Sequence, residues 1–374
     1  MKLKALLIGW IACVMPVHAS EYRVVSGVDN NPYRLADGGN EQAIFTAVSV
    51  DQDLSKYIGK NNRMFIDVGG DGVLYQGDFQ DADAWSARAR VGFKSKRRSP
   101  EVFHFKTRLQ VEGEIKRKTY IERSTGQVAD FGGEEIAERF DTNTVRFRTV
   151  IDAKPLSWLR SIIDVSAERV NYLEDYASLG LSELDYEQGT AVAKLKFRLA
   201  DPLTFSLAAP ISVRRYLNRR ARDIDGNLIA NTDLEYTYYG IEAGMVIKPS
   251  AAFRLSLKAA YEQRDDNESG YYDRTRQRVA VNMRYAFGDN MLRLRGFYSS
   301  RELREDAPAA PADPTDYGRT RDGYTASFVF ERRFGFHRLP TFAFLEVRYQ
   351  SYDNSDPIYA YDRGMAVIGL TIHD

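Results

Sequence analysis

VFHFKTRLQVEGEIK, which runs from Val102 to Lys116, decides the fold class of this sequence. From Phe103 onward, residues without formal charge alternate with residues that are almost all ionisable. Successive side chains of a β-strand point to opposite faces, so the stretch predicts a strand with one uncharged and one charged face. A strand of 15 residues is long for a soluble sandwich and long enough to cross a bilayer at a tilt.

The beginning of the chain has the features of an export signal. Two lysines precede an apolar run over 5–17, and Val-His-Ala at 17–19 matches a small-residue cleavage site. We expect cleavage after Ala19, which divides the chain into a signal peptide, 1–19, and a single β-barrel domain, 20–374. Cys13 lies inside the signal, so the mature chain is expected to use no disulfide and no cysteine metal site.

The alternation of the opening stretch recurs along the whole chain. The expected strands are 22–29, 43–52, 63–69, 84–94, 102–116, 141–153, 159–172, 188–200, 203–213, 236–248, 252–264, 276–287, 291–302, 322–333, 341–352 and 363–373. Only alternate residues of a barrel strand face lipid, so a mean hydropathy of −0.43 is compatible with membrane insertion.

The connections between these strands alternate in length. Short turns are expected at 154–158, 201–202, 249–251, 288–290 and 334–340, and long polar loops at 122–140, 174–187, 217–235, 265–275 and 303–321. Outer-membrane barrels sort short turns to the periplasm and long loops to the outside. The sequence therefore predicts an all-β fold, a transmembrane antiparallel up-and-down β-barrel of about 16 strands whose lumen holds no plug domain.

The charged face of each strand is expected to line the pore. The basic positions well inside the strands are Arg88, Arg90, Lys106, Arg108, Arg146, Arg148, Lys194, Lys196, Arg198, Arg214, Arg254, Lys258, Arg278, Arg284, Arg293, Arg295 and Arg348. Nearer the strand ends, the same phase adds Lys94, Lys116, Arg160, Lys248, Arg264, Arg276, Arg301, Arg333 and Arg363. The acidic positions on this face are Glu112, Glu114, Asp152, Asp164, Glu168, Glu242, Glu262, Glu331 and Glu346.

Charge is thus divided within a protein that has 52 basic and 52 acidic residues. The expected pore wall is strongly basic, and the expected outer loops are acidic. A wall rich in arginine and lysine favours anions, and arginine adds bidentate recognition of carboxylate and phosphate. The alternative is that the basic residues pair with carboxylates on neighbouring strands and only keep the lumen solvated.

Catalysis has little support in the sequence. The mature chain has three histidines, His104, His337 and His373, and only His104 lies well inside a clearly phased strand. No serine is evidently placed against a histidine and an acid, as a barrel hydrolase would need. We expect His104 to be an ordinary wall residue, and we expect no catalytic residue, no metal site and no cofactor. Nucleic acid is not an expected partner, because the arginine-rich surface would lie inside the barrel.

Two short motifs resemble a known family. GVDNNPYRL at 27–35 and YQGDF at 75–79 resemble the opening of outer-membrane β-barrel porins that accompany exopolysaccharide production and export. The resemblance covers the first two expected outer connections. It implies a channel through which an anionic polysaccharide leaves the cell, with periplasmic or inner-membrane components as partners. Such exporters often carry a periplasmic helical-repeat domain, which this chain has no room for, so a separate partner would supply it.

Three functions follow as hypotheses. The leading one is a channel in the outer membrane of a Gram-negative cell with an electropositive lumen that exports an acidic polysaccharide. The second is a general or nutrient-uptake porin selective for small anions, and the third is a barrel enzyme that acts on lipid or glycan. The expected partners are outer-membrane lipid and lipopolysaccharide, an acidic polysaccharide or another anionic solute, and export components of the periplasm.

Overall fold

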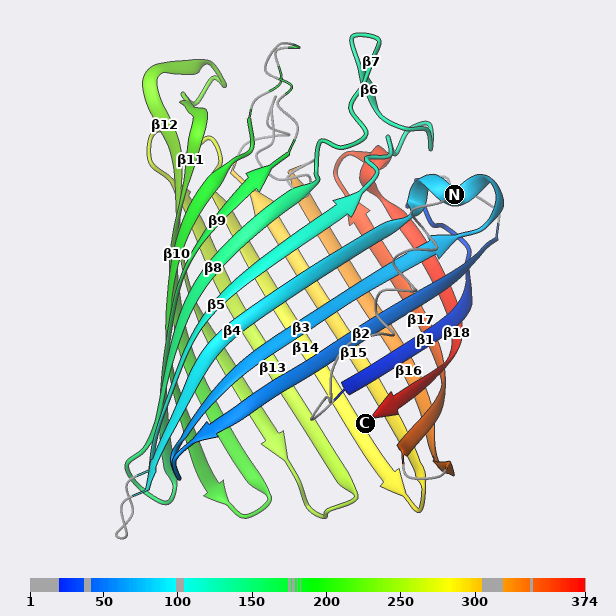
Figure 1. Ribbon diagram of the computed structural model, residues 1–374. Coiled ribbons are helices and arrows are strands. Elements are labelled where there is room, and N and C mark those ends of the chain that lie inside the picture. Colours follow the sequence, from blue (N-terminus) through cyan, green and yellow to red (C-terminus); the bar gives the residue numbers. More distant parts are fainter. Residues whose placement is uncertain are drawn as a thin grey trace.

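The computed structural model describes residues 20–36, 42–98, 104–173, 176, 179, 181, 183–304, 319–336 and 339–373 (Figure 1). Sixteen long strands form one closed antiparallel barrel, which confirms the expected fold class and strand number. The proposed signal peptide lies outside the described residues, so its cleavage stays a prediction, and so does the absence of a plug. No helix in the described part of the chain is long and apolar enough to cross a membrane.

The strands follow the expected order and are mostly longer than expected. They are β1 (Ser20–Asp29), β2 (Ala43–Ile58), β3 (Asn62–Tyr75), β4 (Ala84–Arg98), β5 (His104–Lys118), β8 (Thr142–Lys154), β9 (Leu159–Tyr172), β10 (Tyr186–Ala200), β11 (Leu203–Arg222), β12 (Leu228–Ile247), β13 (Phe253–Asp266), β14 (Arg274–Phe287), β15 (Asn290–Leu303), β16 (Thr320–Phe336), β17 (Leu339–Asn354) and β18 (Tyr361–His373). Val102 and Phe103, the first residues of the opening stretch, lie outside the described residues.

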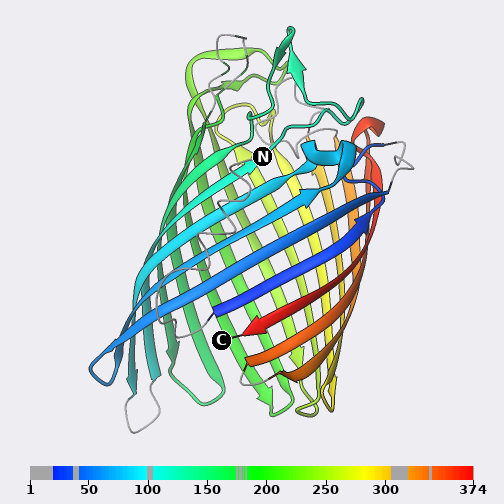
Figure 2. The same cartoon turned by 45° about the vertical axis from the view of Figure 1, so that its right-hand side comes forward.

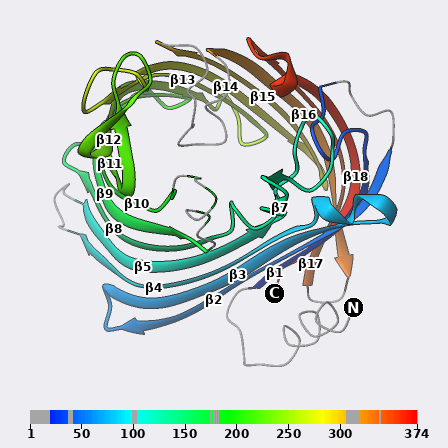
Figure 3. The same ribbon diagram turned by 90° about the horizontal axis from the view of Figure 1, so that it is seen from above.

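Each strand pairs with the next, and β1 pairs with β18 to close the ring (Figure 2). The view along the barrel shows an open ring in which β13–β15 lie across the lumen from β2–β5 (Figure 3). The connection 119–141 carries a separate two-stranded hairpin, β6 (Asp130–Phe131) and β7 (Glu134–Glu135). Two short 3-10 helices, η1 (Gly77–Ala82) and η3 (Pro357–Tyr359), lie in other connections of the same rim.

The expected turn 334–340 is shorter than predicted, since β16 continues to Phe336 and β17 begins at Leu339, and the expected loop 217–235 is wrong. Most of 217–235 is strand, because β11 continues to Arg222 and β12 begins at Leu228, which leaves only 223–227 as the turn. Packing of buried side chains stabilises the longer β11 and β12, and the alternating pattern alone does not predict this packing. Tyr216, Tyr236 and Tyr272 are each no more than 1% exposed and form one cluster there with Leu234 and Ala221. Residues 305–318 of the expected loop 303–321 lie outside the described residues.

The two faces of the wall differ as the strand pattern requires. On β8, Val145 and Phe147 are exposed by 58% and 50%, while Arg146 between them is bonded to carboxylates of neighbouring strands. Exposed apolar side chains follow the same alternation on the other strands. An apolar outer surface on a barrel that has no free edge is what the bilayer core demands of a spanning protein.

A buried apolar cluster lies on the inner face at the junction of the two chain ends. Val25, Phe45, Tyr75, Phe344 and Val367 form a buried cluster there, together with Ala43 and Val329. The residues come from β1–β3 and β16–β18, so the cluster joins the first strands to the last. The cluster therefore gives β1–β3 and β16–β18 apolar side chains on the inner face as well as on the outer face.

Glycines opposite aromatic residues allow close packing inside the wall. Gly92 is the register partner of Phe65, and Gly323 is the partner of Tyr352. In each pair, a methyl group on the glycine would collide with the aromatic ring. The ring therefore lies over the neighbouring strand, and only glycine leaves room for it.

Candidate functional site

A row of alternating charges crosses one side of the inner wall. Asp67, Arg90, Glu112, Arg146 and Glu168 are consecutive register partners on β3, β4, β5, β8 and β9. Arg90 Nε donates to Glu112 Oε2 at 2.6 Å, and Arg146 bridges Glu112 at 3.2 Å and Glu168 at 2.7 Å. Cross-strand pairs of opposite charge stabilise a sheet. In this row, the basic residues are neutralised by their neighbours.

Further pairs lie on the same strands and elsewhere on the wall, including β12–β14 and β17. The bonded pairs are Arg148 with Asp164, Arg160 with Asp152, Lys258 with Glu242, Arg274 and Arg278 with Glu262, and Arg348 with Glu346. Glu114 pairs with Lys116 at 3.2 Å. The alternative hypothesis from the sequence was that wall charges pair with one another and keep the lumen solvated. It applies to these residues.

The wall of β13–β15 has a different composition. Arg254, Arg284 and Arg293 are direct register partners across three neighbouring strands, and Arg295 lies two residues further along β15. None of the four forms an ion pair with a described residue, and the contact of Arg293 is with the sulfur of Met291 at 3.8 Å. We call these four residues the arginine array. It lies across the lumen from the neutralised β2–β5 side (Figure 3).

The remaining expected basic residues lie on the inward phase of their strands with varied surroundings. Arg88 pairs with Asp51, Lys106 is the register partner of Asp152, Arg108 stacks over the ring of Phe65, Lys194 and Lys196 follow one another on β10, Arg198 pairs with Asp201, and Arg214 donates to Gln188. Arg214 also lies 4.2 Å from the ring centroid of Tyr186. Lys194 and Lys196 form no ion pair with a described residue.

The sequence prediction missed the carboxylates of the first three strands. Asp51 and Asp53 on β2, and Asp67 and Asp71 on β3, share the inward phase with buried Phe65. Phe45 and Phe65 are apolar but point inward, so the apolar pattern of 43–52 and 63–69 left the phase of the strands ambiguous. The wall is therefore more acidic than strands β4–β18 alone suggest, and the added acids lie opposite the arginine array.

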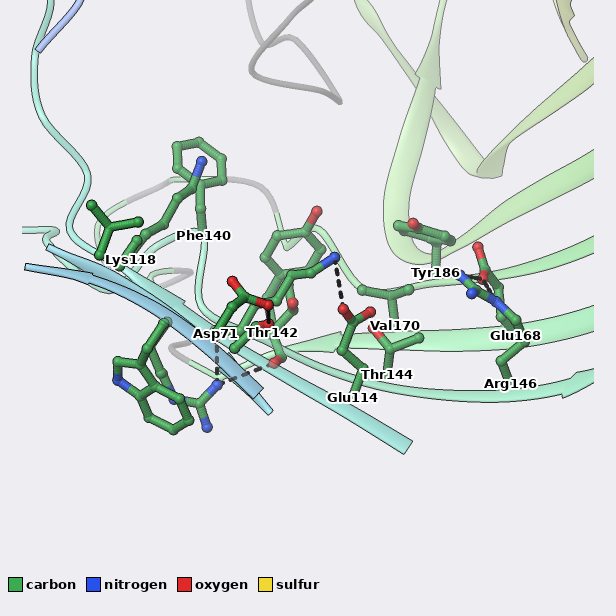
Figure 4. Close-up of a pocket in the computed structure, with 17 residues that line it drawn as sticks. Asp71, Glu114, Lys118, Phe140, Thr142, Thr144, Arg146, Glu168, Val170 and Tyr186 are labelled. Atoms are coloured by element: carbon green, nitrogen blue, oxygen red, sulfur yellow. Dashed lines mark hydrogen bonds and ion pairs between the residues drawn. The ribbon is translucent and has the colours of Figure 1, made fainter. Parts of the chain in front are cut away.

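A recess opens in the neutralised side of the wall, towards the outer rim (Figure 4). Its volume is about 550 Å³. Its lining includes Glu114, Arg146 and Glu168 of the wall and Phe140 of the connection 119–141. Tyr186 adds an aromatic face. Four basic and three acidic side chains line the recess, so it offers polar walls that are close to neutral.

The two motifs that resemble exopolysaccharide porins meet in the structure. Asp29, which is fully buried, accepts from Arg363 Nε at 3.0 Å and from the hydroxyl of Tyr75 at 2.9 Å. Asn31 donates to the carbonyl oxygens of Leu35 and Asp362, and the Tyr33 and Phe79 rings lie 5.4 Å apart. We call Asp29, Tyr75 and Arg363 the closure triad. These motif residues join β1, β3 and β18 instead of facing the open lumen.

No group suited to catalysis is assembled in the described part of the chain. His104 is the register partner of Arg98 and Lys154 at the end of β5, and its Nδ1 has no hydrogen-bond partner. No group of three metal-ligating side chains lies close enough among the described residues to hold an ion. The expectation that the protein is not an enzyme stays a prediction.

No protein-family model matches the sequence, and no curated protein matches it. Among solved structures, OccAB1 of Acinetobacter baumannii is 11% identical over 95% of each chain, with a TM-score of 0.48. OccK2 (OpdF) of Pseudomonas aeruginosa is 10% identical over 95% of this chain and 97% of its own, with a TM-score of 0.47. A bacterial polysaccharide outer membrane secretin is 9% identical over 95% of this chain and 97% of its own, with a TM-score of 0.44. Likenesses this distant carry no argument about what passes through this barrel.

Proposed function

We propose that the protein is an outer-membrane channel that favours anions and through which an acidic polysaccharide leaves the cell. The arginine array is the observation that carries this proposal. Four guanidinium groups lie together on one wall without a carboxylate partner among the described residues. Their charge acts on the lumen, because neighbouring acids do not cancel it.

The facing wall supports the same function. Asp51, Asp53 and Asp67 of β2 and β3 lie across the lumen from the array and pair with Arg88, Arg63 and Arg90. The facing wall is therefore neutralised, and an anion is drawn towards β13–β15. Arginine binds carboxylate through two parallel N–H bonds, and low-dielectric walls focus its field along the pore. A linear polymer of acidic sugars could pass its carboxylates from one arginine to the next.

The reversal potential in a planar bilayer under a salt gradient tests anion preference. The variant Arg284→Gln/Arg293→Gln should shift the reversal potential towards zero or towards cation preference. Arg169→Gln/Arg215→Gln is the matched control, because it removes the same charge from outward-facing residues that are 55% and 61% exposed. Cation preference of the unaltered channel, or equal shifts in both variants, would contradict the proposal.

The array would equally serve uptake of small anions, which is the second candidate function. Gene deletion separates the two candidates. Loss of surface polysaccharide with normal uptake of small anions supports export, and the opposite result supports uptake. Export also requires a periplasmic partner, which co-purification with the full-length barrel would identify, and lipopolysaccharide is the expected neighbour of the outer rim.

A further inference from the structure

A second group of arginines lies at the outer mouth, apart from the array. Arg34 belongs to the connection 30–42, Arg123 to the connection 119–141, and Arg321 to the outer end of β16. The connection that carries Arg123 lies against the connection 30–42, because Gly126 is next to Leu35 and Tyr33, and Arg123 itself reaches Tyr361 at the start of β18. Three separate segments of the chain therefore bring one guanidinium each to the same place.

Tyrosine rings form the base of this group. Arg321 lies 4.6 Å from the ring centroid of Tyr352, and Arg123 lies 5.6 Å and 5.5 Å from the centroids of Tyr359 and Tyr361. Arg34 lies 6.0 Å from the Tyr361 centroid, and the Tyr352 and Tyr361 rings are 5.0 Å apart. Gly323 lets the Tyr352 ring lie over β16, where Arg321 reaches it.

The guanidinium groups lack an anionic partner. None of Arg34, Arg123 and Arg321 forms an ion pair with a described residue. Arg123 Nη1 and Arg321 Nε are buried and have no hydrogen-bond partner among the residues that the structure describes. Burial, together with the positive charges of Arg321 and Arg34, lowers the pKa of Arg123. Buried donors without partners are costly, and like charges brought together add to that cost.

We infer that Arg34, Arg123 and Arg321 form a binding site for the carboxylate of an acidic sugar at the outer mouth of the channel. The inference rests on the proposed function, since it names where the acidic polymer is held as it leaves. A carboxylate would neutralise the group and accept the unpaired N–H donors, while the tyrosine rings would contact the sugar ring. Because Arg123 lies on the connection 119–141, a bound anion would also tie that connection to β16 and to the connection 30–42.

Hydrogen–deuterium exchange of the detergent-solubilised full chain tests the site locally. Galacturonate should slow exchange of the segments 30–36, 119–128 and 355–361 relative to sodium chloride at equal ionic strength, whereas glucose should not. Arg123→Gln and Arg321→Gln should each weaken this protection, with an apparent affinity reduced roughly tenfold or more, as expected for loss of a charged hydrogen bond. Arg220→Gln, an exposed arginine of the same rim, is the matched control and should retain the protection.

Three results would overturn the inference. One is the absence of protection by galacturonate, another is equal protection of the Arg123→Gln and unaltered proteins, and the third is protection by inorganic phosphate alone, which would assign the site to phosphate groups such as those of lipid. None of these results depends on the reversal potential. The mouth site can therefore fail while the anion preference of the lumen stands, and the converse also holds.

Discussion

The stability of the closed barrel depends on the three buried residues of the closure triad. Asp29 has no exposed surface, and its partner Arg363 is 8% exposed. Breaking a buried ion pair from one side leaves an uncompensated charge, which typically costs about 3–5 kcal/mol. Surface pairs contribute far less, because water solvates both partners when they separate.

We predict that Asp29→Asn lowers the free energy of unfolding by about 3–5 kcal/mol. Urea unfolding of the barrel in lipid vesicles, followed by its mobility on unheated gels, measures the change. Asp51→Asn is the control, because Asp51 and its partner Arg88 are each 46% exposed, and we expect a loss below about 1 kcal/mol. Equal losses in the two variants would show that the triad has no special role.

At the scale of single strands, the period-two pattern predicted where most strands lie and which face carries their charged residues. The period-two pattern of 84–94 and 141–153 fixed both the strands and the faces of their charged residues. It left the faces of 43–52 and 63–69 open, because Phe45 and Phe65 pack inside the barrel. It also could not extend β11 and β12 beyond the membrane, since the buried tyrosines that hold them there come together only in the folded chain.

The glycine–aromatic pairs belong to the same scale. We predict that Gly92→Ala destabilises the barrel by about 1–3 kcal/mol, the usual cost of overpacking, because the new methyl group displaces the Phe65 ring. Gly113→Ala on neighbouring β5 is the control, since no atom lies within 4 Å of a methyl group there. The same unfolding assay compares them. A Gly92→Ala protein as stable as Gly113→Ala would refute the packing role of Phe65.

At the scale of the whole molecule, charge is arranged around the ring. The sequence pattern predicted that the four arginines of the array face the lumen, but not which side chains lie next to them. Strand register decides whether an arginine lies beside another arginine or beside an acid. The row from Asp67 to Glu168 is neutralised, whereas the four arginines of the array on β13–β15 form no ion pair with a described residue. Asp29 and Tyr75 of the closure triad lie in the motifs that carry the family resemblance, and Arg363 was expected on the pore wall. Their joint role required contacts between residues 334 positions apart.

Anion preference should therefore depend on ionic strength. The Debye length is about 30 Å at 0.01 M salt and about 3 Å at 1 M. We predict a strong anion preference when the reversal potential is measured near 0.01 M and a weak one near 1 M, because the field of the array then no longer spans the lumen. A preference that stays constant over this range would point to steric selection.

The closure triad has a consequence for the order of events in biogenesis. Asp29 emerges from the ribosome near the beginning of the chain, and Arg363 emerges almost at its end. Before β18 pairs with β1, the Asp29 carboxylate has no guanidinium partner. In an unclosed barrel, only water can solvate this charge. We expect chains truncated before β18 to stall in an unclosed state, because this strand supplies both the pairing partner of β1 and the guanidinium that neutralises Asp29.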